Sequence, residues 1–146
     1  LDARVNPEAA GNIRAAAAED TVLGLMLLYE EHRRAVREGA VSLTADDFVT
    51  AFNRRVFEAI MELENSDGGF STAVLGEQFD PDEMGRLAKL AQARRNLSEN
   101  GQSGLKAAVR TLQDEKNAVT KDDAPPEDSL ERLLEKKRQK MHKSNG

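Results

Sequence analysis

The stretch Phe52-Asn53-Arg54-Arg55-Val56-Phe57-Glu58-Ala59-Ile60-Met61-Glu62-Leu63 (residues 52–63) carries the clearest helical pattern in this 146-residue sequence. Its apolar residues recur at spacings of four, four and three, and an α-helix turns once in about 3.6 residues. The side chains that share one face are Phe52, Val56, Ile60 and Leu63, with Phe57 and Met61 widening the stripe. An apolar face of this kind must be covered by neighbouring elements, so the stretch predicts a helix inside a packed helical domain.

The segment before this helix is apolar on every side. Residues 22–28 read Val-Leu-Gly-Leu-Met-Leu-Leu, a pattern typical of a central helix with neighbours around it. A helix start is indicated at residues 6–8, where Asn6 can serve as the N-cap, Pro7 as the first helical residue and Glu8 as an acid in the first turn. We therefore expect one long helix from Asn6-Pro7-Glu8 to Tyr29. Gly24 would permit another helix to cross closely.

Start and stop signals predict the remaining helices. They indicate a short charged surface helix at residues 30–38 ended by Gly39, and then a capping box of Thr44 and Asp47 with a helical turn from Ala45 that carries Phe48 inward. A short helix that buries Val74, Leu75 and Phe79 is expected at 72–78, after Ser71, and the next helix starts at Asp80-Pro81 and has the apolar face Met84, Leu87, Ala88, Leu90 and Ala91. A loop is expected at 96–104, followed by a helix that runs to about Val119 and carries the stripe Leu105, Ala108, Val109 and Leu112. Ten glycines, four prolines and 4% aromatic residues argue against a β-sandwich or barrel. The predicted fold is all-α, a compact bundle of about six helices over residues 1–119.

Beyond the bundle we expect a linker at residues 120–128, because Pro125-Pro126 restricts the backbone before each proline. An amphipathic basic helix is expected at residues 129–146. Its candidate partner-binding residues are Leu130, Leu133, Leu134, Lys137, Arg138 and Met141. Three interpretations stay open for this helix: a solvated end whose cations complement the helix dipole, a contact with nucleic acid, and a helix laid into an apolar groove of a partner.

Residues that commonly carry catalysis are sparse. The chain has no cysteine and only two histidines, His32 and His142, so neither thiolate chemistry nor a histidine metal centre is expected. Its glycines match no phosphate-binding loop. We interpret three acid pairs as helix-capping or polar-face residues: Glu19-Asp20, Asp46-Asp47 and Asp82-Glu83. We assign the pair Asp122-Asp123 to the linker. We expect Arg54 and Arg55 to pair with acids on a neighbouring helix. We expect no enzyme activity, no metal and no cofactor.

Charge and hydropathy limit the partners. A net charge of −5 and few aromatic residues argue against direct nucleic-acid binding. The longest apolar run, residues 22–29, is far shorter than the ~20 residues that span a bilayer. A cytoplasmic protein is expected. The first residue is Leu1, which suggests a piece of a longer protein.

Two stretches resemble a known family. Ala18-Glu19-Asp20 leading into residues 22–28, and residues 47–60, are similar to a helical module shared by two bacterial replication proteins. These are the C-terminal helicase-binding domain of the DnaG-type primase and the N-terminal domain of the DnaB-type replicative helicase. Later stretches, residues 75–79 with 82–87, and 105–116 after Asn96, resemble primases of Gram-positive clostridial type. The resemblance covers residues 7 to about 119.

The resemblance implies a function that the residue patterns alone do not. In the primase module a helical bundle leads through a long helix to a C-terminal hairpin, which supplies most of the helicase contact. Here the tail after residue 119 is short and interrupted by prolines, which departs from a full hairpin. The main hypothesis is a non-catalytic domain that binds the helicase hexamer and tethers a primase to the replication fork. The alternatives are the helicase's own N-terminal self-association and primase-binding domain, and a helical nucleic-acid-binding domain.

Overall fold

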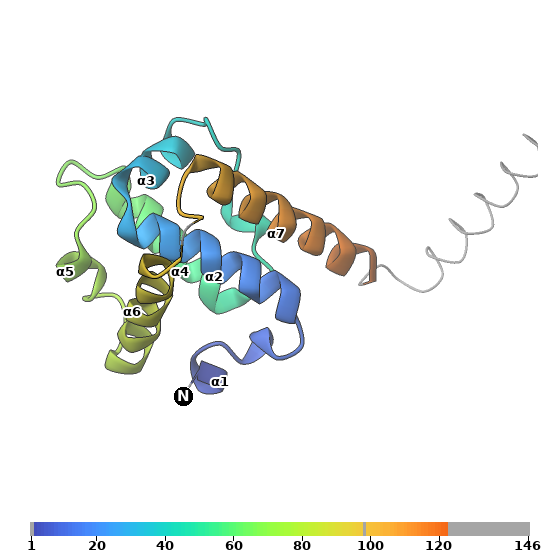
Figure 1. Ribbon diagram of the computed structural model, residues 1–146. Coiled ribbons are helices and arrows are strands. Elements are labelled where there is room, and N and C mark those ends of the chain that lie inside the picture. The colour runs from blue at the N-terminus through green and yellow to red at the C-terminus, as the bar shows by residue number, and fades with distance from the viewer. Residues whose placement is uncertain (1, 98, 123–146) are drawn as a thin grey trace, which may run out of the picture. The chain divides into compact units, whose positions relative to one another are not determined.

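The computed structural model describes residues 2–97 and 99–122, and every element within them is helical (Figure 1). In chain order the elements are α1 (Asp2–Val5), the 3₁₀ turn η1 (Pro7–Ala9), α2 (Ile13–Leu28), α3 (Glu30–Arg37), the 3₁₀ turn η2 (Ala45–Asp47), α4 (Ala51–Glu64), α5 (Thr72–Leu75), α6 (Pro81–Arg95) and α7 (Gln102–Asp122). The predicted all-α class is therefore confirmed. The chain divides into two units, Leu1–Lys116 and Asn117–Gly146. The expected C-terminal helix at 129–146 lies outside the described residues.

Helix α2 is the centre of the first unit, as its sequence predicts. Helices α3, α4 and α6 all pack against it, and the side chains of Val22, Leu23, Leu25 and Met26 are completely buried. The close crossing expected at Gly24 is present: a Cβ built on this residue would lie 2.5 Å from the Leu90 carbonyl oxygen in α6. The absence of a side chain at position 24 thus sets how closely α2 and α6 approach.

Helix α4 confirms the stripe that predicted it. Phe52, Val56, Ile60 and Leu63 are buried, and the helix ends at the turn-forming residues after Glu64. Phe48, carried inward by the turn before α4, is fully buried as expected. The capping box at Asp80 is also present and starts α6.

The N-terminal helix differs from its prediction. Asn6 and Pro7 start only a 3₁₀ turn, and α2 begins later, at Ile13 after Gly11-Asn12. The predicted cap residues serve α4 instead: the Asn6 side chain donates to Thr50 Oγ1 at 3.2 Å, and Glu8 Oε1 accepts the Ala51 N–H at 2.8 Å. The Glu8 carboxylate thus accepts one of the first backbone N–H groups of α4, which have no partner within the helix. The Asn6 bond ties the N-terminal segment to the residue that precedes α4.

Four smaller expectations also need correction. Helix α5 ends at Leu75, with Gly76 as its C-cap, and not at residue 78 as expected. The side chain of Val74 was expected in the core, but it is 42% exposed. The loop after α6 ends at Gly101, because α7 already begins at Gln102. Helix α7 reaches Asp122, three residues beyond its expected end. The pre-proline restriction of Pro125 falls on residue 124, so it does not end the helix before Asp122.

Candidate interaction surface

The Glu19 side chain is completely buried. Its interpretation as a capping or polar-face group is therefore wrong. Glu19 accepts hydrogen bonds from the Val49 N–H at 2.6 Å, Thr50 Oγ1 at 2.7 Å and Asn53 Nδ2 at 3.0 Å. These donors precede or begin α4, so the carboxylate joins α2 to the positive end of that helix. A sequence signal existed: the residues three and four positions away from Glu19 on either side are alanine, valine and leucine.

Asp47 and Glu83 behave as expected, whereas Asp122, expected in the linker, is the last residue of α7. Asp47 Oδ2 accepts the Thr44 N–H at 2.9 Å. Glu83 completes the Asp80 capping box and pairs with Arg55 at 2.7 Å, as predicted for that arginine. Donation from the Arg55 guanidinium lowers the pKa of the Glu83 carboxyl below its ordinary value; burial opposes this, and the bond from the Asp80 N–H adds to it.

Among residues 2–97 and 99–122, no acidic side chain forms an ion pair with Arg54, contrary to the interpretation from the sequence. Its guanidinium donates to the Phe48 carbonyl oxygen at 2.7 Å. The bond holds the turn before α4 against that helix, so Arg54 has a local structural role. The two adjacent arginines therefore have different partners: Arg54 bonds to the backbone of the turn before α4, and Arg55 pairs with Glu83 of α6.

Helix α3 is not merely a charged surface helix. Arg33 is buried, donates to the Met26 carbonyl oxygen at 2.7 Å and pairs with Glu64 at 3.3 Å. His32 is also buried, and its Nε2 lies 2.6 Å from the Asn100 carbonyl oxygen. Arg33 thus satisfies the C-terminal end of α2, and His32 holds the loop before α7. Within residues 2–97 and 99–122, no group of three or more histidine or acidic side chains is arranged to hold a metal ion.

The six side chains predicted to bind a partner lie outside the described residues. They are Leu130, Leu133, Leu134, Lys137, Arg138 and Met141. Their role therefore stays a prediction.

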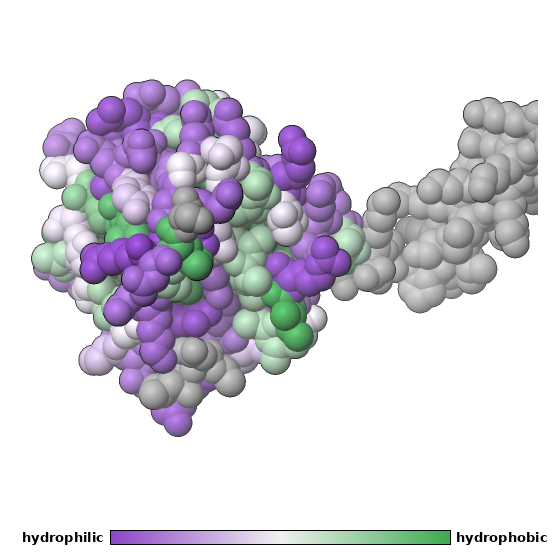
Figure 2. All heavy atoms as spheres, in the orientation of Figure 1, coloured by the Kyte–Doolittle hydropathy of each residue, from purple (hydrophilic) through white to green (hydrophobic). Residues whose placement is uncertain are grey.

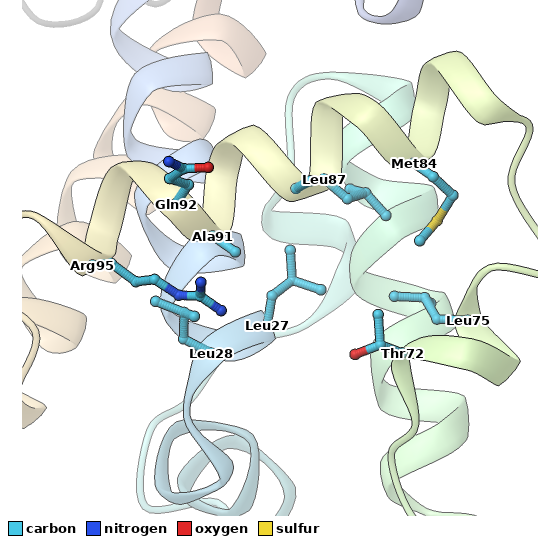
Figure 3. A pocket seen from close by; sticks show the side chains of 10 residues that line it. Leu27, Leu28, Thr72, Leu75, Met84, Leu87, Ala91, Gln92 and Arg95 are labelled. Carbon is cyan, nitrogen blue, oxygen red and sulfur yellow. The ribbon is translucent and has the colours of Figure 1, made fainter.

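An apolar groove opens where the end of α2 meets α5 and α6, and we call it the α6 groove (Figure 3). It has a volume of about 270 Å³. Its lining residues are Leu27, Leu28, Thr72, Leu75, Met84, Leu87, Ala88, Ala91, Gln92 and Arg95. Leu75 and Leu87 are buried and form its floor, whereas Leu27 and Met84 are only half-buried. The sequence pattern placed these apolar residues in the core, because periodicity reports an apolar face and not whether another element covers it.

A second, shallower surface lies between α2 and α7. It is lined mostly by small side chains, among them Ala17, Ala107 and Ala108. Ile13, in the first turn of α2, is 72% exposed. In the orientation of Figure 2, pale green, weakly apolar side chains lie over this region. An ion pair between Arg14 and Glu115, 3.2 Å long, joins the two helices.

Comparisons with known proteins give one match. A family model described as the DnaB-like helicase N terminal domain matches residues 12–118. The match begins just before α2 and ends within α7, so it contains helices α2 to α6 and most of α7. No curated protein and no solved structure matches the chain. None of the helices within the described part of the chain is long and apolar enough to cross a membrane.

Proposed function

The chain belongs to the family of DnaB-like helicase N-terminal domains, and from this we propose that its bundle is a non-catalytic protein-interaction domain of the DNA replication machinery. The observation that carries the proposal is the match over residues 12–118. It covers the elements that form the hydrophobic core, from α2 to α7. The half-buried apolar walls of the α6 groove agree with this proposal, because apolar side chains of a partner could pack between them.

The first candidate is the N-terminal domain of a replicative helicase, which associates with copies of itself and with a primase. The family match favours this candidate, because it names the helicase domain directly. In this role the bundle contributes no chemistry. It brings the helicase and its partners together, which raises the local concentration of one activity beside the other.

The second candidate is the helicase-binding domain of a primase. It is favoured by the resemblance of residues 75–79, 82–87 and 105–116 to clostridial primases. In this role the chain would bind the helicase hexamer and hold primer synthesis at the fork, with the residues of the 129–146 segment as the main contact.

Two binding titrations and a sedimentation measurement separate the candidates. The full 146-residue chain, labelled with a fluorophore, is titrated with the replicative helicase hexamer and separately with the primase from the same genome, and fluorescence anisotropy is recorded. Binding to the primase, together with self-association in sedimentation velocity, is expected for a helicase domain. Binding to the hexamer without self-association supports the primase domain instead. If the chain binds neither protein and stays monomeric, the proposed interaction function is wrong.

A further inference from the structure

The α6 groove is a small apolar hollow of about 270 Å³ that lies along one helix, α6. Its floor, Leu75 and Leu87, is apolar and buried. Met84, Ala88, Ala91 and Arg95 follow one another along α6 at spacings of four, three and four, so they form one continuous stripe along the groove. A partner helix laid along that stripe would contact it for about three turns.

One end of the groove carries an unmatched positive charge. Arg95 is exposed, and none of the acidic side chains in the described part of the chain forms an ion pair with it. In Figure 3 its side chain extends from α6 toward Leu28, at the end of the groove opposite Met84. The other arginines of α6 are engaged: Arg86 pairs with Asp20 at 2.6 Å, and Arg94 donates to Asn100 at 3.2 Å.

A helix that covered this groove would remove water from the Arg95 guanidinium. A charge that is buried without a partner is costly, whereas a carboxylate can accept two hydrogen bonds from a guanidinium. The occupant must therefore supply an acid at the Arg95 end as well as apolar side chains for the floor. Because Met84 and Arg95 are eleven positions apart on α6, about 16 Å separates the apolar end of the stripe from the charged end.

We propose that the α6 groove binds an amphipathic helix of a partner protein, which places leucine-like side chains between Leu27 and Met84 and a carboxylate on Arg95. The inference rests on the proposed interaction function and adds the site and the chemistry of the partner. The recognised segment has an apolar stripe at positions i, i+3 or i+4, and i+7. An aspartate or glutamate follows or precedes that stripe at the Arg95 end.

The first test uses a synthetic peptide, so it does not depend on which replication protein binds the chain. The probe is a sixteen-residue helical peptide (~16 residues span about 24 Å) with leucines at helical spacing and two glutamates near one end. Its twin has glutamines in place of the glutamates. Each is titrated into the isotope-labelled full chain, and the backbone amide signals are followed by NMR. The acidic peptide is expected to shift the amides of Leu27, Leu75 and Ala88, and to bind about tenfold more tightly than its twin. Shifts confined to other surfaces, or equal affinity of both peptides, would overturn the proposal.

Two variants and a matched control place the contact on the groove. Ala88→Glu puts a charge on an exposed groove position, and Arg95→Glu reverses the charge at its end. Ala93→Glu makes the same change at an exposed position of α6 that does not line the groove. Affinity for the acidic peptide should fall at least tenfold in the first two variants and stay unchanged in the third, with identical circular dichroism. Equal affinities in all three variants contradict the proposal.

Other occupants give distinct results in the same samples. If Ala88→Glu alters the sedimentation of the chain alone, a second copy fills the groove. If Ala88→Glu shifts the amide signals of residues 129–146, the chain's own C-terminal segment fills the groove. Either result contradicts the proposal. If the wild-type chain binds the peptide as expected but neither helicase nor primase, the groove assignment stands and the proposed replication function fails.

Discussion

Gly24 in α2 lies directly against the Leu90 carbonyl in α6, at a distance that leaves no space for a Cβ atom. The contact explains why a glycine is present in the middle of a buried helix, where it would otherwise cost about 0.5–1 kcal/mol relative to alanine. It also positions α6, which forms one wall of the α6 groove. The two central helices and the candidate binding surface are therefore linked through one small residue.

The first prediction concerns this crossing. Gly24→Ala should destabilise the chain by about 1–3 kcal/mol, because the added methyl group overpacks a backbone contact. The matched control is Gly85→Ala in α6, where a Cβ would meet nothing within 4 Å. That substitution should stabilise the chain by about 0.5–1 kcal/mol. Urea denaturation followed by circular dichroism measures both, and a Gly24→Ala variant as stable as wild type would contradict the close approach.

The second prediction concerns the buried Glu19 carboxylate. Glu19→Ala should lower the free energy of unfolding by about 3 kcal/mol or more, because Val49, Thr50 and Asn53 each lose a charged acceptor. Glu58→Ala changes an exposed glutamate of α4 and should stay within about 0.5 kcal/mol of wild type. Chemical denaturation of the two variants side by side tests the difference. Equal losses would mean that Glu19 is not structurally important.

The third prediction concerns pH. The Arg55 guanidinium lowers the pKa of Glu83 in the folded chain, so the stabilisation from this pair is complete above the unfolded value of 4.5. It is lost as the pH falls through the lowered folded value, because the unfolded chain then takes up the proton more readily. Arg55→Met should therefore cost about 0.2–1 kcal/mol at pH 7 and progressively less as the pH drops below 4.5. Denaturation of both proteins across this range measures the change, and a constant difference at every pH would be inconsistent with the pair.

The fourth prediction concerns the C-terminal segment. Removal of residues 127–146 takes away Leu130, Leu133 and Leu134 together with the basic cluster. If the segment is the main contact with the replication partner, affinity should fall at least tenfold, about 1.4 kcal/mol. Removal of residues 143–146 alone keeps these leucines and should leave affinity unchanged. Both truncated chains are titrated, by fluorescence anisotropy, against whichever replication protein the full chain binds. If the chain that lacks residues 127–146 keeps the affinity of the full chain, the C-terminal segment is not the main contact.

The fifth prediction concerns nucleic acid. The net charge of −5 opposes binding to phosphates, so fluorescently labelled single-stranded DNA should show no anisotropy change with the chain at low salt. The control is the same titration at high salt, which would abolish any binding that depends on counterion release. Binding at low salt that disappears at high salt would instead favour a nucleic-acid-binding domain.

Much of the fold could be predicted from local patterns. The stripe from Phe52 to Leu63, the capping box at Asp80 and the apolar segment around Gly24 each depend on residues close together in sequence, and the structure confirms all three. The N-terminal caps could not be predicted in the same way. Asn6 and Glu8 bond to residues more than forty positions away, and a local pattern contains no information about such a partner.

The candidate site shows the same division. Residue type and spacing by themselves determined an all-helical chain, the central position of α2 and the family resemblance, because helix periodicity and capping are short-range properties. Only the tertiary structure decided that Glu19 and Arg33 are buried, that Val74 is exposed, and that Leu27 and Met84 line an open groove instead of a closed core. Burial depends on which other elements cover a face, and that is settled when α2, α5 and α6 pack together.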